Sequence, residues 1–371
     1  MLKRVTVTNF KNFSKKVIFD LSSPANYEFN EEIVSQGCIT KGIVYGINGS
    51  GKSNLALAVF DIILHMTDKQ KLLEKYINYL NLSSNKPCAD FEYVFTFDGK
   101  ELIYQYGKKD RETLTYEKLS IDGNEVLNYD FGQQAGYTNL KGAENLQLTS
   151  KINSSSNKLS RVKYLSSNAI LQDDPVNKVF GKFIDFVNRM LMFYSLDTNG
   201  YQGLQEGVDS YTQGIVREHK EKDFQEFLKK SDIDYELVSM NINGVDDLFC
   251  KFSNKIVPFS LIASTGTKSL ALFYYWYIKI SKASLVFIDE YDAFYHFELS
   301  QELVKQLKQL SKTQVFLSTH NTDLLSNDIL RPDAYFIIED NEIRSLDKCT
   351  DKELRRAHNI QKMYKAGSFN G

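Results

Sequence analysis

The sequence predicts a mixed α/β fold with an antiparallel meander and a helical insertion, and three observations carry this prediction. Short apolar runs that end in polar residues are typical of buried strands. An aromatic-rich stretch over residues 90–130 alternates with period two, which is typical of antiparallel strands. Amphipathic segments with apolar residues at helical spacing lie at 53–65 and 298–311. The strand-like runs cover residues 38–45, 284–288 and 315–318.

The amino-terminal part predicts strands first and helices afterwards. Residues 3–9 alternate apolar and polar side chains and predict a strand, with residues 17–21 as its partner. The elements expected next are a strand over 38–45 that ends at Gly46, a helix over 53–65 and a second helix near 68–80.

Tight turns divide the aromatic-rich stretch into four segments, FEYVFTF, LIYQYG, TLTYEKLSI and VLNYDF. Asp-Gly pairs are typical of two-residue hairpin turns, because these residues tolerate the positive φ angles that such turns require. The turns are expected at Asp98-Gly99, Lys108-Lys109 and Asp122-Gly123. The stretch therefore predicts a meander of consecutive antiparallel strands.

The remaining elements follow from composition and period. Residues 131–160 are rich in Gln, Asn and Ser and predict a mobile loop. Helices are expected over 176–193 and 215–231, with a linker over 197–214 between them, and a hairpin over 235–258 turns at Asn243-Gly244. The last third predicts a helix over 264–281, a strand over 284–288, a helix over 298–311, a strand over 315–318 and a hairpin over 335–346 that turns at Asp340-Asn341.

Composition excludes several classes of protein. A chain of 371 residues is long enough for about two domains or one core with a large insertion. Its 45 basic and 47 acidic residues give a formal net charge of −2, so nucleic-acid binding would require a local basic patch. Four scattered cysteines without a CxxC pair fit a reducing cytosol and do not indicate a zinc knuckle. We expect a cytoplasmic protein.

Neither a signal peptide nor a membrane span is expected. The amino-terminal residues MLKRVTVTNFKNFSKK contain no apolar core region. The longest apolar run, over 270–278, has about half the length of a membrane span.

The strongest chemical signal is the octapeptide Gly-Ile-Asn-Gly-Ser-Gly-Lys-Ser that begins at Gly46. Its spacing matches a phosphate-binding P-loop, GxxxxGK[ST], between a strand and a helix. Its glycines let backbone N–H groups turn inward around phosphate oxygens, and the helix N-terminus adds partial positive charge. Lys52 is expected to reach the β- and γ-phosphates, and Ser53 to bind Mg²⁺.

A second signal is the apolar strand over 284–288, which ends in Asp289 and Glu290. Ligands of open α/β sheets bind at the carboxyl ends of the strands. Asp289 is expected to hold Mg²⁺ and Glu290 to orient or deprotonate the attacking water. The alternative is a strand that continues into an acidic surface loop.

His320 ends the next predicted strand, in Phe-Leu-Ser-Thr-His. It is expected to contact the γ-phosphate, although a single histidine is more often structural. A further segment, Ala-Ser-Thr-Gly-Thr-Lys-Ser over 263–269, opens a helix about twenty residues before Asp289. Serine and glycine at a helix N-terminus form an anion site, here for a second subunit's nucleotide, although an ordinary N-cap is the alternative.

The order of these motifs resembles an ABC-type ATPase of the SMC/RecF/OLD group. The opening Thr8-Asn-Phe-Lys-Asn-Phe13 is similar to the NFKSF-like start of that group. STGTKS in place of LSGGQ, FIDEYDAFYH, STHN and the ending over 360–369 resemble the AAA-family ATPases of bacterial abortive-infection systems, of the AbiLi/RloA type. The resemblance covers residues 1–60 and 258–371 well, and the middle in general pattern.

This resemblance implies a fold, a reaction and its site residues. It implies a P-loop core of ABC-ATPase type in which residues 1–130 and 250–371 fold together, with 131–249 as a loop and helical insertion or lid. It implies hydrolysis of ATP with Mg²⁺, with Glu290, His320 and Lys52 as catalytic residues and with Ser53 and Asp289 at the metal. The residues implied to bind ATP are Gly46, Asn48, Gly49, Ser50, Gly51, Lys52, Ser53 and Asn54, together with Ser264, Gly266 and Thr267 acting on a partner subunit.

The resemblance also implies partners. ATP would close a head-to-tail homodimer, at least, and the dimer would control a separate effector nuclease or toxin in an anti-phage abortive-infection system. We expect no nuclease domain in this chain, because it ends soon after the core. Asp292 stands at the D-loop position, while Gln105 and Gln172 both remain candidates for the Q-loop glutamine.

The alternative is a RecF/SMC-like, nucleotide-gated DNA-binding protein of DNA repair. The basic residues that favour it stand near the carboxyl end, and a solvated amphipathic helix explains them equally well. They are Arg355, Arg356, Lys362 and Lys365.

Overall fold

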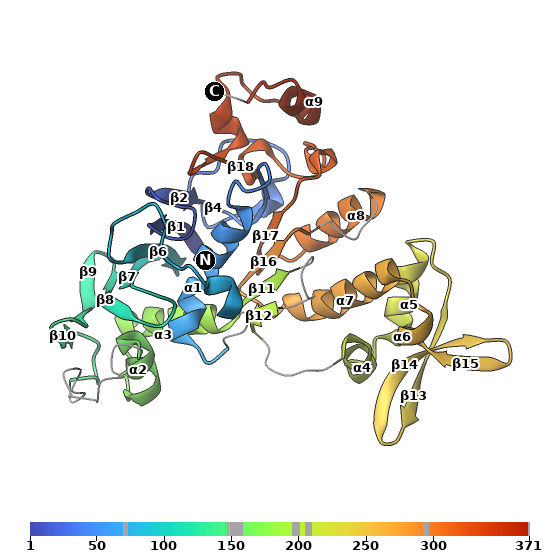
Figure 1. Cartoon of the computed structure of the whole chain (residues 1–371), viewed down its shortest axis with the longest axis horizontal. Coiled ribbons are helices and arrows are strands. Elements are labelled where there is room, and N and C mark those ends of the chain that lie inside the picture. Colours follow the sequence, from blue (N-terminus) through green and yellow to red (C-terminus); the bar gives the residue numbers. More distant parts are fainter. Residues whose placement is uncertain are drawn as a thin grey trace.

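The computed structural model of the chain contains two seven-stranded sheets with a long helix between them (Figure 1). It describes residues 1–69, 73–144, 146, 148, 159–194, 201–204, 210–291 and 297–369. Among these residues, no helix is long and apolar enough to cross a membrane.

The core sheet has the strand order β12-β11-β16-β17-β5-β18-β19. Its five inner strands, β11, β16, β17, β5 and β18, pair in parallel, and one antiparallel strand lies at each edge. All five residues of β5, β16 and β17 are buried, as expected for strands that are covered on both faces. The strands are β5 (Lys41–Tyr45), β11 (Met190–Tyr194), β12 (Tyr201–Gly203), β16 (Leu285–Asp289), β17 (Gln314–Ser318), β18 (Tyr335–Glu339) and β19 (Glu342–Ser345).

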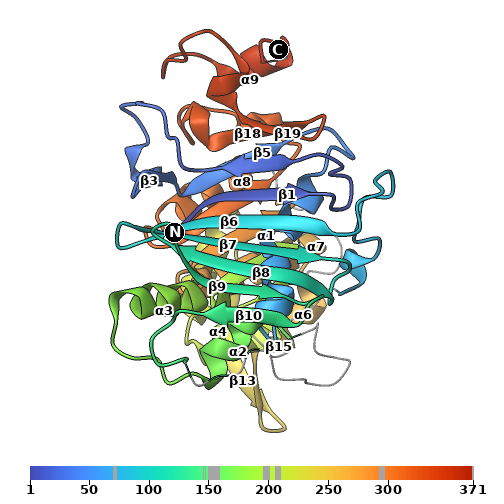
Figure 2. The same ribbon diagram turned by 90° about the vertical axis from the view of Figure 1, so that its left-hand side faces the viewer.

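The second sheet is antiparallel throughout, in the order β10-β9-β8-β7-β6-β1-β2 (Figure 2). The predicted meander and its two Asp-Gly turns are confirmed, with φ of 54° at Asp98 and 49° at Asp122. The strands are β1 (Leu2–Thr8), β2 (Val17–Asp20), β6 (Ala89–Phe97), β7 (Lys100–Lys108), β8 (Leu114–Ile121), β9 (Asn124–Asp130) and β10 (Ala135–Thr138). A small pair, β3 (Val34–Ser35) and β4 (Cys38–Ile39), lies before β5.

Helix α1 (Lys52–Met66) lies between the two sheets, and nearly all of its residues are buried. Its Asp61 accepts hydrogen bonds from the hydroxyls of Tyr79 (2.9 Å) and Tyr106 (2.8 Å). It also forms an ion pair with Lys108 of β7 at 2.8 Å, in which both side chains are 0% exposed. These contacts tie the meander to the helix that begins at the P-loop.

A separate arm carries several short helices, the long helix over 265–280 and a three-stranded sheet, β13-β14-β15 (Figure 1). The Asn243-Gly244 turn is confirmed between β13 and β14. The elements of the arm are α4 (Tyr211–Arg217), α5 (Glu221–Lys229), β13 (Glu236–Ile242), β14 (Val245–Phe252), β15 (Lys255–Pro258), α6 (Phe259–Ile262) and α7 (Thr265–Ile280). The remaining helices are α2 (Arg161–Asn168), α3 (Pro175–Asn188), α8 (Phe297–Lys308) and α9 (Ile360–Lys365).

Three expected helices differ from the structure, and the one expected over 215–231 is divided into α4 and α5 at His219, which has φ of 52°. The segment near 68–80 contains a single 3₁₀ turn, Leu73–Tyr76, and residues 70–72 lie outside the described part. Asn78 has φ of 53°, a left-handed conformation that a helix cannot continue through. The helix expected over 176–193 ends at Asn188, because the apolar run that follows forms strand β11 instead.

The segment 131–249, expected as a loop and helical insertion, also contributes to both sheets. Strand β10 extends the meander, and β11 and β12 join the core sheet beside β16. The run Met-Leu-Met-Phe at 190–193 is apolar at every position, as a strand covered on both faces requires. Of the loop predicted over 131–160, residues 145, 147 and 149–158 lie outside the described part.

Candidate functional site

Three adjacent strands of the core sheet end at one edge, and the motif residues follow directly. In the sheet, β17 lies between β16 and β5, and Ile288 pairs with Leu317 and Ser318 with Val44. Because these strands are parallel, their carboxyl ends meet on the same side. The edge therefore brings together Gly46, Asp289 and His320, which are far apart in the sequence.

The loop glycines meet two requirements, a left-handed backbone at Gly49 and Gly51 and close packing at Gly46. Gly49 and Gly51 have φ of 81° and 113°, which only glycine adopts readily. A Cβ added at Gly46 would lie 2.3 Å from Ser50 Oγ and 2.7 Å from Cγ2 of Ile338 on β18. Within the described residues, the buried Ser50 Oγ has no hydrogen-bond partner. A phosphate oxygen in this loop would provide one.

Lys52 is buried against the loop that it follows. Its ammonium donates to the carbonyl oxygens of Gly46 (2.9 Å) and Ile47 (3.3 Å) and lies 2.9 Å from Nε2 of His320. Burial lowers the pKa of Lys52, and the negative charges of Glu290 and Asp289 oppose that shift. A cation held here is placed for an anionic ligand.

Asn12 braces the P-loop from outside, a role that was not predicted from the sequence. Its Nδ2 donates to the carbonyl of Ser50 at 3.2 Å, and its Oδ1 accepts from Asn54 Nδ2 at 2.7 Å. A Cβ added at Gly51 would lie 2.6 Å from Asn12 Nδ2. The available signal was the TNFKNF opening, which contains Asn12.

Replacing Asn12 with alanine is expected to weaken ATP binding about tenfold, because two hydrogen bonds that hold the loop are lost. The affinity of a fluorescent ATP analogue measures the effect. Asn85→Ala, at an exposed asparagine of the same type, is the control and should bind like the wild type. An unchanged affinity in Asn12→Ala would show that the loop holds its shape without this brace.

The two carboxylates after β16 occupy different environments. Asp289 is 3% exposed, and its Oδ1 accepts a hydrogen bond from Ser318 Oγ. Ser318 Oγ in turn accepts from the backbone N–H of Glu290 at 2.9 Å. The side chain of Glu290 is 24% exposed, and its Oε1 lies 3.5 Å from Nε2 of His320. Asp289 is thus fixed by protein, while Glu290 can reach water.

Glu290 also has an unusual backbone, with φ of 48°. Non-glycine residues in this left-handed region cost energy and persist where surrounding contacts hold them. Here the N–H of Glu290 is held by Ser318, and the N–H of Tyr291 by the Ser318 carbonyl at 2.9 Å. The neighbouring strand β17 therefore aims the carboxylate.

The residues present fit a magnesium nucleotide. Ser53 lies in the first turn of α1 and Asp289 ends β16, so one hydroxyl and one carboxylate are available for a metal. The described part of the chain contains no group of three or more His, Cys, Asp or Glu side chains that could hold a metal ion by themselves. Magnesium at such sites takes one or two carboxylates and completes its shell with phosphate oxygens and water.

Asn48, which was also predicted to bind ATP, is exposed at the tip of the P-loop. Its neighbours Ile47 and Gly49 are exposed as well. Asp292, expected at the D-loop position, lies outside the described residues. Of the two Q-loop candidates, the amide of Gln105 donates to Glu92 Oε2 at 2.7 Å and the backbone of Gln172 donates to Lys141 at 3.0 Å.

The segment Ser264–Gly266–Thr267 lies apart from this edge. Ser264 is the N-cap of α7 and accepts from the backbone N–H of Thr267 at 3.1 Å. Ser264 is exposed, and around Gly266 the only atom near an added Cβ is Ser264 Oγ at 3.9 Å. The amino end of α7 lies beside α6, on the arm and away from α1 (Figure 1). The structure does not bring these residues to the P-loop of the same chain.

Comparison with known proteins gives a family and a fold. Residues 43–326, more than half of the chain, match the family model described as "AAA domain, putative AbiEii toxin, Type IV TA system". No curated protein matches the chain. Among solved structures, an SmcHead bound to the C-winged helix domain of ScpA has 14% identity and a TM-score of 0.50, and the match covers 94% of this chain and 99% of that one.

Two further solved structures are similar at 14% identity. The SMC head domain from Thermotoga maritima has a TM-score of 0.43, with 92% of this chain and 97% of that one covered. The Smc head domain with an extended coiled coil bound to the C-terminal domain of ScpA, from Pyrococcus furiosus, has a TM-score of 0.48, with 94% and 97% covered. The match at 0.50 shows an SMC-head fold, and the predicted ABC-type P-loop architecture is confirmed.

Proposed function

The chain belongs to the family described as "AAA domain, putative AbiEii toxin, Type IV TA system", and from this membership we propose a magnesium-dependent ATPase that closes a head-to-tail dimer on ATP. A single observation carries the reaction: Lys52, His320 and Glu290 form a chain of contacts of 2.9 Å and 3.5 Å at the edge of the core sheet. Lys52 begins α1, Glu290 follows β16 and His320 lies two residues after β17, so the fold brings three separate parts of the chain together here.

The P-loop and its neighbours would hold the nucleotide. Backbone N–H groups over 46–53 and the amino end of α1 face the phosphates, and Lys52 supplies positive charge. Ser53 and Asp289 would hold Mg²⁺, which neutralises phosphate charge when bound. Ser318 keeps Asp289 in place through its hydroxyl.

Glu290 would be the general base for the attacking water. It is partly exposed, so water reaches it, and its orientation is set by Ser318. His320 lies between Glu290 and Lys52, where it would contact the γ-phosphate of a nucleotide that Lys52 holds. Glu290 would accept the proton of the attacking water, and His320 would contact the γ-phosphate.

Phosphate release in the presence of Mg²⁺ tests this function directly. We expect turnover that stops when EDTA removes the metal. The assay is run alone and with the proteins that co-purify with the chain. Absence of turnover in every one of these mixtures would remove the ATPase proposal.

The signature residues would act on the nucleotide of a second copy. Ser264 and Gly266 are open to solvent, cap a helix of sixteen residues and lie away from the P-loop of their own chain. A helix N-terminus favours negative charge, and head-to-tail pairing would bring it to the partner's phosphates. We propose that residues 1–130 and 259–371, with β11 and β12, form the core, and that α4, α5 and β13–β15 form the lid.

Replacing Ser264 with arginine is expected to abolish ATP-dependent dimerisation, because the large side chain fills the space at the start of α7. ATP binding by the single subunit should stay within about twofold of the wild type. Light scattering gives the mass, and analogue binding gives the affinity. Ser167→Arg on α2, at another exposed serine, is the control and should still dimerise. Dimers of Ser264→Arg would contradict the head-to-tail arrangement.

The biological role that we propose is regulation of a separate effector, a nuclease or toxin, in an anti-phage abortive-infection system. The family description names a putative AbiEii toxin of a type IV TA system, and it supports a role within a system of that kind. An ATP-gated dimer could hold its partner in one nucleotide state and free it in the other.

A DNA-binding protein of SMC type is the second candidate, and the SMC-head fold favours it. The basic residues near the carboxyl end support it less. Arg355 lies 2.9 Å from Glu353, and Lys365 lies 3.8 Å from Asp323. Such pairing reduces the charge available to a phosphate backbone.

A further inference from the structure

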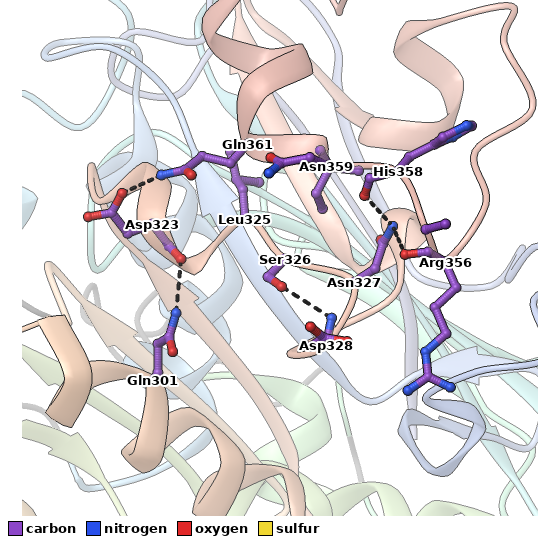
Figure 3. Close-up of a pocket in the computed structure, with 12 residues that line it drawn as sticks. Gln301, Asp323, Leu325, Ser326, Asn327, Asp328, Arg356, His358, Asn359 and Gln361 are labelled. Atoms are coloured by element: carbon purple, nitrogen blue, oxygen red, sulfur yellow. Dashed lines mark hydrogen bonds between the residues drawn. The ribbon is translucent and has the colours of Figure 1, made fainter.

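A cavity of about 690 Å³ lies between the segment that follows His320 and the carboxyl-terminal segment (Figure 3). A volume of this size suits a ligand-binding pocket. The proposed ATPase site does not include it. Its lining is polar and draws on the start of α8, on residues 323–328 and on residues 356–361.

Three parts of the chain meet at Asp323, on one wall of this cavity. The side-chain amide of Gln361 donates to Asp323 Oδ1, and Gln301 Nε2 donates to the Asp323 carbonyl at 3.2 Å. Gln361 belongs to α9, within the ending that the sequence analysis singled out. Figure 3 shows Asp323 and Gln361 side by side.

Asn327 forms the inner wall and is 4% exposed. Its Nδ2 donates to the carbonyls of Arg355 (3.0 Å) and His358 (3.1 Å), which fastens the carboxyl-terminal segment. Its buried Oδ1 has no hydrogen-bond partner in the described part of the chain. Buried acceptors without a donor are rare in folded proteins and mark a place where a donor is missing.

The lining is rich in acceptors. Asp328 is exposed, and no ion pair is found for it among the described residues. The side chains of Arg356 and His358 extend to the opposite side of the cavity from Asp323 (Figure 3). Hydrogen-bond acceptors and an unpaired carboxylate favour a positively charged ligand with several hydrogen-bond donors. A guanidinium or ammonium group has both properties.

The cavity is connected to the nucleotide site by a short path. The backbone N–H of Asp323 donates to Asn321 Oδ1 at 2.9 Å, and Asn321 follows His320 directly. The hydroxyl of Tyr45, the last residue of β5 before the P-loop, donates to the Asn321 carbonyl at 3.2 Å. A group bound beside Asp323 therefore lies one turn of chain away from His320.

We propose that this cavity docks an arginine or lysine side chain of a partner polypeptide at Asp328, beside Asp323. The inference rests on the proposed control of a separate effector, and it identifies the surface and the chemistry of that contact. Binding there changes the contacts of the turn that carries His320, so partner occupancy and nucleotide state influence each other.

Selection from a displayed library of random dodecapeptides on the full-length chain tests the proposal. We expect the enriched peptides to share an arginine or lysine at one position. Their affinity should fall about tenfold in Asp328→Asn, since a charged hydrogen bond is replaced by a neutral one. Asp351→Asn, an exposed aspartate outside the cavity, is the matched control and should bind them like the wild type.

Several outcomes would overturn the proposal. They are an empty selection, peptides without a shared basic residue, peptides enriched in acidic residues, and affinities that Asp328→Asn leaves unchanged. ATP turnover is measured on the same preparations. Basic peptides that depend on Asp328 in a protein without turnover would support the docking site while removing the ATPase, and the reverse pattern would remove the docking site alone.

Discussion

Replacing Glu290 with glutamine is expected to slow ATP turnover by at least about 10²-fold while ATP binding stays intact. The carboxylate is the partly exposed member of the pair after β16, and its Oε1 lies 3.5 Å from His320. Glutamine keeps the shape of the side chain and its reach toward His320, but it cannot accept the proton of the attacking water. The loss therefore falls on the chemical step.

The same variant should accumulate the closed form. If ATP gates a head-to-tail dimer, slow hydrolysis traps it, and light scattering will show the mass doubling only when Mg-ATP is added. Glu302→Gln, at an exposed glutamate of α8, is the control and should turn over ATP normally. A Glu290→Gln protein that hydrolyses ATP at the wild-type rate would assign the base to another residue. A mass that ATP does not change would place assembly on a different interface.

Replacing Lys108 with methionine is expected to destabilise the chain by about 3–5 kcal/mol, because it leaves Asp61 as an uncompensated buried charge. Both side chains are 0% exposed, and the ion pair measures 2.8 Å. Burial lowers the pKa of Lys108, and Asp61 opposes that shift. For a chain of this size we expect the midpoint of thermal unfolding to fall by about 5 °C.

Two further variants distinguish the effect of an unpaired buried charge from the effect of losing a lysine side chain. The double variant Asp61→Leu with Lys108→Met should recover much of the lost stability, since no charge remains buried. Lys182→Met breaks a surface ion pair with Asp98 whose side chains are 49% and 67% exposed, and it should change stability by at most about 1 kcal/mol. Equal losses of stability in Lys108→Met and Lys182→Met would show that solvent screens the charge of Asp61.

Asp61 also matters for function because of where α1 begins. The helix starts at the P-loop and is held by two tyrosine hydroxyls and one ammonium from the meander side. The meander thus sets the position of the loop that would bind phosphate. Local sequence contains no sign of this, since Asp61 is 47 residues from Lys108.

The chemical motifs could be predicted because each is a short string at the end of a strand. Gly46 to Ser53 is defined by local spacing, and the apolar run before Asp289 indicates a buried strand whose carboxyl end faces the ligand. The helix start at Ser264 was likewise predictable, since its N-cap bond reaches only to Thr267. The roles of these residues in ATP hydrolysis remain predictions.

The wrong helix predictions fall on segments in which tertiary contacts outweigh the local sequence pattern. The run after Asn188 has helical spacing when considered alone, but pairing with β16 makes it a strand of the core sheet. In the segment near 68–80, individual side chains are buried against α1 without forming a helical face. The hydroxyl of Tyr76 donates to the carbonyl of Leu57, and the hydroxyl of Tyr79 donates to Asp61.

The sequence by itself determined the strand ends, the P-loop, the acidic pair, the histidine and the meander, because these depend on period and on spacing over a few residues. Tertiary structure alone decided that Asn12 braces the P-loop, that β11 completes the core sheet, and that the carboxyl-terminal segment is fastened to Asn327 beside a polar cavity. The reason is physical. Contacts between residues far apart in the chain depend on how sheets and helices pack, and single-sequence patterns contain no record of that packing.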